Sequence, residues 1–130
     1  MATAENLQTI TATAGSAVPI YRFVALAADG KVDLQATADA RVDGVSCEAA
    51  TADGDLLAVA PVSQPATAKV EASAAISVGD LVAATVTTGK AKTAAAAGAA
   101  TYVVGVAKTE ATADGDIIEV WLNPFKNAAS

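Results

Sequence analysis

An internal repeat constrains the fold of this chain more than any other feature of its sequence. Residues 42–59 read VDGVSCEAATADGDLLAV and residues 103–120 read VVGVAKTEATADGDIIEV, so 10 of 18 positions are identical without a gap. The match continues upstream, where the apolar spacing of residues 18–25 is found again in residues 76–83. Self-similarity at a fixed period is typical of one supersecondary unit used twice. We therefore expect two copies, over about residues 17–62 and 75–122.

The remaining residues flank these copies. An N-terminal arm, residues 1–16, precedes them, a linker, residues 63–74, separates them, and a short tail, residues 123–130, follows. A chain of 130 residues has the length of one domain. We expect the two copies to share a single β domain, residues 17–122, and to be related by a pseudo-twofold axis.

Each copy predicts four short strands, because β-branched and alternating apolar segments are separated by turn residues. The expected strands cover residues 20–26, 31–34, 41–47 and 56–62 in the first copy and residues 81–86, 90–92, 101–108 and 117–122 in the second. Residues 94–100 are rich in Ala and Gly and too short for a self-stabilising helix, which indicates a loop with some helical tendency. The predicted fold class is all-β, a compact barrel or sandwich of two tandem pseudo-repeated units with an extended N-terminal arm.

Turn chemistry separates the expected strands, since Asp-Gly pairs supply the positive φ that hairpin turns need. The expected structural turn residues are Asp29, Gly30, Asp53, Gly54, Gly89, Asp114 and Gly115. Gly44 and Gly105 interrupt strands at equivalent places, which indicates a bulge or a close backbone contact.

Composition excludes several kinds of chemistry. The chain has no His and one Cys, so it has no imidazole base or metal ligand, no internal disulfide and no Cys-cluster zinc site. A net charge of −6 argues against a nucleic-acid partner. No apolar stretch approaches the roughly 20 residues that cross a bilayer, and the N-terminus lacks the pattern of a signal peptide. We expect synthesis in a cytoplasm, no membrane partner, and no catalytic, metal or cofactor-binding residue.

The acidic pairs Asp53–Asp55 and Asp114–Asp116 are the most conspicuous candidates for chemistry. They could belong to a calcium loop or act as paired catalytic carboxylates, as in some glycosidases. The spacing of an EF-hand loop is missing, however, and a duplicated fold repeats its turns. We interpret both pairs as hairpin turns in which the second Asp begins the next strand.

Three further side chains have ordinary interpretations. Lys31 and Lys90 follow a turn glycine, as a carrier lysine would, but neither has the flanking residues of a carrier hairpin. We predict solvated turn lysines. Cys47 has no histidine to activate it and is predicted to be a buried or half-exposed strand thiol.

The aromatic residues and the arm supply candidates for contacts with partners. Phe23 and Trp121 are expected to pack in the core or between the copies. Phe125 lies beyond the last expected strand, as a lid on the barrel or as an anchor to a partner. Leu7 and Ile10 stand in an Ala- and Thr-rich arm that we expect to order against another chain.

The order of the motifs resembles a known family. The chain carries ISVGDLV at residues 76–82, GKA at 89–91, an Ala/Gly-rich loop, VGVA at 104–107, GD at 115–116 and a closing IEVWL at 118–122. Over about residues 15–123 it resembles the capsid cement, or head decoration, proteins of tailed bacteriophages.

The resemblance implies a non-enzymatic β domain that binds the outer surface of a phage capsid and stabilises it. It implies the major capsid protein as a partner, a homotrimer at threefold or quasi-threefold positions, and a place in the virion. Leu7, Ile10, Trp121 and Phe125 are then the candidate capsid or subunit contacts. The alternative is a carbohydrate-binding or adhesive β module of a virion or cell surface, although five aromatic residues make a poor sugar-binding platform.

Overall fold

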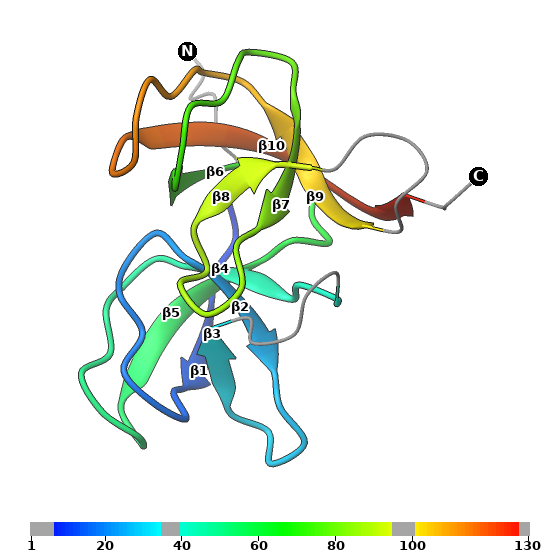
Figure 1. Ribbon diagram of the computed structural model, residues 1–130. Coiled ribbons are helices and arrows are strands. Elements are labelled where there is room, and N and C mark those ends of the chain that lie inside the picture. Colours follow the sequence, from blue (N-terminus) through cyan, green and yellow to red (C-terminus); the bar gives the residue numbers. More distant parts are fainter. Residues whose placement is uncertain (1–6, 35–39, 95–100, 128–130) are drawn as a thin grey trace, which may run out of the picture.

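In the computed structural model, each strand among the described residues belongs to one of two five-stranded antiparallel sheets (Figure 1), and the expected all-β class is confirmed. The structure describes residues 7–34, 40–94 and 101–127. Unit 1 contains β1 (Ile10–Thr13), β2 (Phe23–Leu26), β3 (Val32–Leu34), β4 (Gly44–Ser46) and β5 (Leu56–Pro61). Unit 2 contains β6 (Thr67–Glu71), β7 (Leu81–Ala84), β8 (Ala91–Thr93), β9 (Thr101–Ala107) and β10 (Ile117–Asn127). Within the described ranges, no helix is long and apolar enough to cross a membrane.

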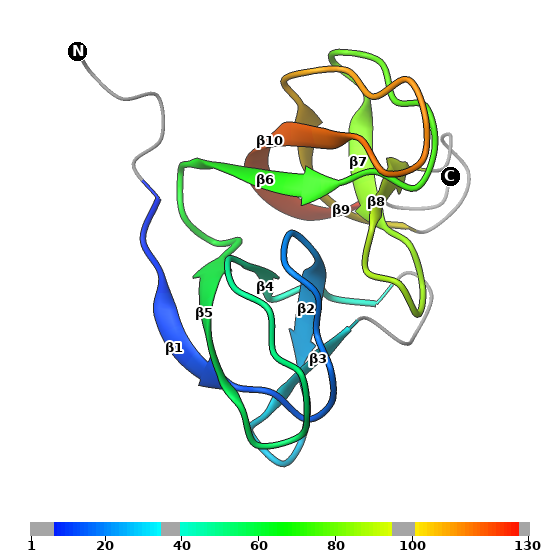
Figure 2. The ribbon, with the colours of Figure 1, turned by 90° about the vertical axis from the view of Figure 1, so that its left-hand side faces the viewer.

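Corresponding strands occupy corresponding places in the two sheets. The order is β1-β5-β4-β2-β3 in one and β6-β10-β9-β7-β8 in the other. Each sheet curls until its edge strands meet at one parallel bridge, which joins Ala14 to Val32 in unit 1 and Ala72 to Ala91 in unit 2. Figure 2 shows the two curled sheets one above the other. Each unit is thus a small barrel whose edge strands are bridged at a single residue pair.

The units begin and end at other residues than expected. β1 lies in the expected arm, β6 lies in the expected linker, and β10 continues into the expected tail. The Gln8 backbone exchanges two hydrogen bonds with the Gln64 side chain, of 2.7 and 2.8 Å, and Leu7 packs against the core. The described part of the arm therefore orders on its own chain. Residues 1–6, 128–130 and most of the Ala/Gly loop, residues 95–100, lie outside the described residues.

Two apolar clusters form the core, and one of them joins the units. The interior of unit 1 is a small aliphatic cluster: Ala14, Val18, Val24, Val32, Ala50, Leu57 and Val59. The larger cluster fills unit 2, but four buried residues of unit 1 belong to it: Phe23, Val42, Val45 and Val62. Phe23 therefore packs between the units, as predicted. Trp121 does not, because its side chain is 57% exposed.

The units are related head to tail and not by the expected pseudo-twofold axis. The turn between β7 and β8 reaches down onto unit 1 beside β2 (Figure 1), where the Phe23 amide donates to the Gly89 carbonyl at 2.7 Å. A Cβ on Gly89 would lie 2.6 Å from the Phe23 oxygen, whereas one on Gly30, the equivalent residue of unit 1, would meet nothing within 4 Å. A twofold axis would bury both turns. The repeat predicts two similar units but carries no information on the symmetry that relates them.

Candidate functional site

The second aspartate of each acidic pair closes its own turn. Asp55 accepts hydrogen bonds from the Thr51 hydroxyl and amide, of 2.8 and 2.9 Å, and from the Ala52 amide. Asp116 accepts the same three bonds from Thr112 and Ala113. These donors stabilise the charged carboxylate, with those of the two threonines contributing most, and hold the pKa of Asp55 and of Asp116 below the usual value. Both residues act in local structure.

The first aspartate of each pair holds a lysine of the same unit. Lys31 Nζ lies 2.8 Å from Asp53, and Lys90 Nζ lies 2.8 Å from Asp114. These hydrogen bonds raise the pKa of both lysines. Lys90 also contacts Glu71 at 3.1 Å and is only 17% exposed, so it is not the solvated turn lysine that the sequence predicts.

This geometry gives neither acidic pair the form of a metal or catalytic site. The two carboxylates of each pair face different partners, and the two pairs lie in different units. Among the described residues, no group of three or more His, Cys, Asp or Glu side chains could hold a metal ion. Cys47 is partly buried, and burial raises the pKa of its thiol, which disfavours the reactive thiolate.

The predicted turn and strand glycines have distinct structural roles. Gly54 and Gly115 take φ values of 92° and 97° in the two acidic turns, and Gly30 and Gly89 also have positive φ. Asp29 accepts a hydrogen bond from the Lys31 amide at 3.0 Å. Gly44 and Gly105 lie where partner strands approach closely, since a Cβ would meet the Val59 side chain at Gly44 and the Trp121 carbonyl oxygen at Gly105. The register shift of this sheet lies in β10, between Leu122 and Phe125.

The four candidate contact residues do not form one site. Leu7 packs against the core, whereas Ile10 on β1 is 57% exposed. Trp121 and Phe125 both lie on β10, with 57% and 40% exposure. Phe125 pairs with Val103 inside the sheet. The prediction that Phe125 lies beyond the last strand is therefore wrong. Two separate surfaces remain, one around Ile10 in unit 1 and one along β10 in unit 2.

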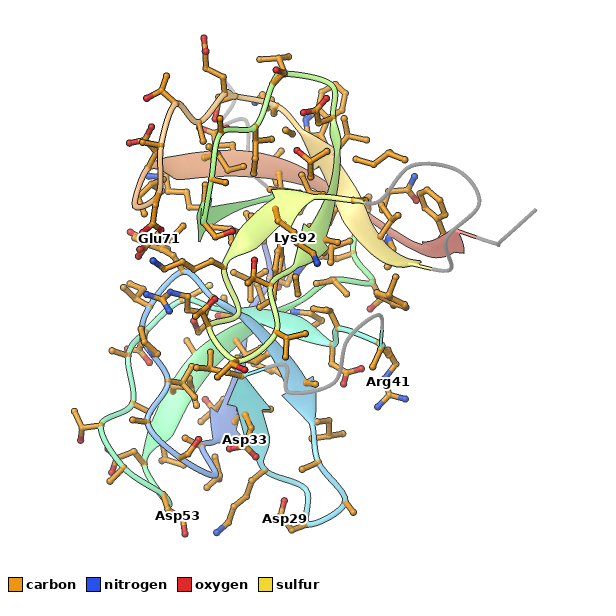
Figure 3. All side chains as sticks on the ribbon, in the orientation of Figure 1. Asp29, Asp33, Arg41, Asp53, Glu71 and Lys92 are labelled. Atoms are coloured by element: carbon orange, nitrogen blue, oxygen red, sulfur yellow. The ribbon has the colours of Figure 1, made fainter. Side chains whose placement is uncertain are left out.

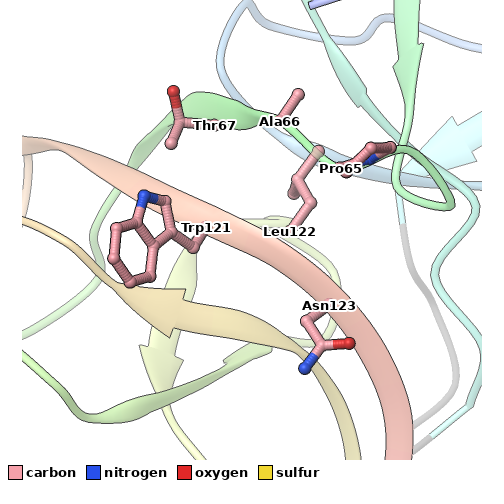
Figure 4. Close-up of a pocket in the computed structure, with 6 residues that line it drawn as sticks. All are labelled: Pro65, Ala66, Thr67, Trp121, Leu122 and Asn123. Carbon is pink, nitrogen blue, oxygen red and sulfur yellow. The ribbon is translucent and has the colours of Figure 1, made fainter. Parts of the chain in front are cut away.

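The surface along β10 is hollowed beside Trp121 (Figure 4). A groove of about 350 Å³ is lined by Pro65, Ala66, Thr67, Trp121, Leu122 and Asn123. Trp121 stands directly across from Thr67 of β6, and Asn123 is exposed on the same strand. The groove thus combines an indole face with an amide and with apolar walls, which suits the recognition of a partner.

A second groove, of about 310 Å³, opens in unit 1. Its rim includes Ile10 and also Leu26, which is 52% exposed and which the sequence analysis did not single out. A comparison of the two repeat copies could have identified Leu26. Ala84 takes the equivalent place in unit 2, since Leu26 pairs with Val32 as Ala84 pairs with Ala91. A large apolar residue thus stands in one copy where the other has a small one.

These features define a two-unit β protein whose described polar clusters serve local structure and whose exposed apolar residues lie in two surface grooves. No protein-family model matches the chain, and no curated protein matches it either. The structure is similar to the crystal structure of the head fiber gp8.5 N base in bacteriophage phi29. That similarity has a TM-score of 0.68 at 25% sequence identity and covers 90% of this chain and 94% of that chain. It therefore extends over both units.

Proposed function

We propose that this chain is a non-enzymatic structural protein of a phage virion that binds the outer surface of the capsid and stabilises it. The observation that carries the proposal is the similarity to the phi29 head fiber base, over 90% of this chain. The motif order seen in the sequence favours the same class. The polar clusters described above agree with it, because both acidic pairs are engaged in turns and ion pairs.

The partners proposed are the major capsid protein and further copies of this chain, assembled as a homotrimer at threefold or quasi-threefold positions. Trp121 is the strongest contact residue, because a large exposed aromatic beside a groove is a typical hot spot of an interface. Phe125 is a second exposed aromatic residue on the same strand, β10. Such a protein needs a rigid body and a shared surface, and no activated side chain.

The test is co-sedimentation of the purified protein with capsids that lack it. We expect saturable, stoichiometric binding and capsids that resist a higher temperature. Trp121→Ala should weaken binding at least tenfold if Trp121 is a hot spot, an effect of about 1.4 kcal/mol or more. Val78→Ala is the matched control, since Val78 is 63% exposed in unit 2 but lies outside the β10 groove. Absence of binding, with the heat resistance of the capsids unchanged, would contradict the proposal.

One observation favours a second candidate function, a carbohydrate-binding or adhesive module. The exposed indole of Trp121 lies beside the Asn123 amide in an open groove, and an aromatic face next to a polar group can bind a sugar ring. A selective signal on a glycan array that Trp121→Ala abolishes would support this candidate. If no glycan on the array is bound, the carbohydrate-binding candidate is contradicted and capsid binding remains the proposed function of the groove.

A further inference from the structure

Unit 2 has an opening between its edge strands, and a segment of unit 1 fills it. In the part of the chain that the structure describes, the edge strands β6 and β8 share one β-bridge, between Ala72 and Ala91. Beside this bridge, the Glu71 amide of β6 donates to the Tyr21 carbonyl at 2.9 Å, and the Phe23 amide donates to Gly89 in the turn that leads into β8. The segment Tyr21–Phe23 therefore lies between the edge of β6 and the β7–β8 turn.

The side chains of this segment show what the opening accepts. Phe23 is fully buried in the core cluster of unit 2. Arg22 donates to the Thr88 carbonyl at 2.8 Å and pairs with Glu71 at 3.3 Å. Tyr21 has a φ of 65°, which is rare for a residue other than Gly and is retained where the surroundings enforce it. The occupant of unit 2 thus places a cation directly before a large apolar residue.

Unit 1 has the equivalent opening between β1 and β3, and no described segment of the chain fills it. Among the described residues, its edge strands share one β-bridge, between Ala14 and Val32. The 310 Å³ groove runs along β1 beside this bridge, with an apolar floor that includes Val24, Val32 and Val59. Ile10 and Leu26 on its rim are 57% and 52% exposed, although both are large and apolar. This is the surface that a strand would cover.

Charge distinguishes between the possible occupants of this groove. Carboxylates outnumber cations near this groove in the described part of unit 1. Asp43, which lines the groove, pairs with Arg41 at 2.7 Å, and Asp53 pairs with Lys31 at 2.8 Å. Asp29 and Asp33, which adjoin the lining residues Gly30 and Val32, add two more carboxylates (Figure 3). Such a rim favours an occupant with a positive charge. In a second copy of this chain, the segment equivalent to Tyr21–Phe23 is Gly79–Leu81, which has Asp80 where Arg22 stands. A second copy would therefore bring a carboxylate to an acidic rim.

We propose that the groove of unit 1 is a docking site for an extended segment of a different protein, in which a cationic residue precedes a large apolar residue. The segment adds a strand at the outer edge of β1, which no described strand pairs with along its length, as an edge strand commonly accepts a peptide. Its apolar side chain enters the groove between Ile10 and Leu26. This site goes beyond the proposed function, because it is distinct from the β10 groove and does not require the partner to be a capsid.

The experiment uses the segment that already fills the equivalent opening. A fluorescent peptide with the sequence of residues 19–25, PIYRFVA, is titrated with the full chain and followed by anisotropy. We expect saturable binding that weakens at least tenfold when Glu replaces Arg in the peptide. Ile10→Lys and Leu26→Lys should each weaken binding at least tenfold, and both side chains are exposed enough for the fold to tolerate the change. Val78→Lys, which adds the same charge outside the groove, should leave binding unchanged.

Three results would overturn the proposal. The first is no saturable binding of the peptide to the unmodified chain. The second is equal binding by the groove variants, whose folding circular dichroism verifies. The third is a dimer in sedimentation that Leu26→Lys dissociates, since the occupant would then be a second copy. The readout contains no capsid, so its failure is distinguishable from a failure of capsid binding.

Discussion

At the residue scale, the acidic turns show how one short motif provides three kinds of contact. In the second copy, Thr112 donates to Asp116, Gly115 supplies the positive φ, and Asp114 holds Lys90. The first copy repeats each contact with Thr51, Asp55 and the Lys31 pair. The Asp-Gly turn is predictable from the sequence. The different roles of the two aspartates are not predictable, because they depend on which carboxylate meets a lysine from another turn, Lys31 or Lys90.

Acid should weaken the fold through Asp55 and Asp116. Hydrogen bonds depress the pKa of both carboxyls in the folded chain, so their stabilising contribution is complete above the unfolded value of about 3.9. That contribution is lost as the pH falls through the lower folded value. We expect Asp55→Ala with Asp116→Ala to lower the Tm at pH 7 and to make stability less dependent on pH below about 4.

Denaturation by urea from pH 2 to 7 measures this effect. Glu110→Ala serves as the control, because it removes an exposed carboxylate outside the two acidic turns. An identical acid dependence in the double variant and the unmodified chain would contradict the assignment.

Gly105 should be far less replaceable than a turn glycine. An added Cβ would collide with the Trp121 carbonyl oxygen of the neighbouring strand, and backbone cannot move aside cheaply. We expect Gly105→Ala to lower the free energy of unfolding by about 3 kcal/mol or more. Gly54→Ala, with a φ of 92° but open space, should cost about 1–2 kcal/mol. Urea denaturation measures both, and equal losses would show that the strands can separate at Gly105.

At the element scale, the strands that the sequence predicts are those with large β-branched or aliphatic residues. β5 begins at Leu56, and β10 begins at Ile117, as expected. β1 and β6 were missed, because ITAT and TAKVE contain mostly small or polar residues. Their stability comes from pairing with β5 and β10, whose partner residues lie 43 or more positions away in the sequence. Local composition does not record such long-range pairing.

The extension of β10 was missed for a different reason. A proline normally ends a central strand, so the sequence places the end of the strand at Leu122, before Pro124. In the structure, the register shifts between Leu122 and Phe125, and pairing with β9 resumes at Phe125. This irregularity in the pairing of β10 with β9 therefore accommodates the proline. It also places Phe125 on the same strand as Trp121.

The candidate surfaces were predictable only in part. Ile10, Trp121 and Phe125 are exposed and remain candidates, whereas Leu7 packs against the core. The two grooves could not be predicted, because each is formed by strands that are distant in the sequence. The exposure of Trp121 depends on the face of β10 that turns outward, and alternation alone does not identify that face.

At the scale of the whole molecule, an ion-pair network and a shared core hold the units together. Arg22 pairs with Glu71, Glu71 with Lys90, and Lys90 with Asp114. Phe23, from unit 1, is buried in the core cluster of unit 2. Because the two units share buried apolar surface, we expect them to unfold together in one transition.

Phe23→Ala should split the single unfolding transition into separate transitions of the two units. Removing a fully buried phenylalanine costs about 3–5 kcal/mol, and here the cavity lies at the junction. Fluorescence of Trp121, the single tryptophan, reports on unit 2, while far-ultraviolet circular dichroism reports on both units. We expect the two signals to coincide in the unmodified chain and to diverge in Phe23→Ala. Leu81→Ala, at the equivalent and only partly buried position, should keep them coincident; coincidence in both variants would contradict the role of Phe23.

The head-to-tail relation of the units gives the molecule a polarity. A twofold body presents the same features at both ends and has no preferred direction. Here the far end of unit 1 carries the exposed Gly30 turn, while Gly89, in the equivalent turn of unit 2, is buried at the junction. The two ends of the molecule therefore present different surfaces. On any surface that recognises one of its ends, it can stand in only one orientation, and every copy points the same way.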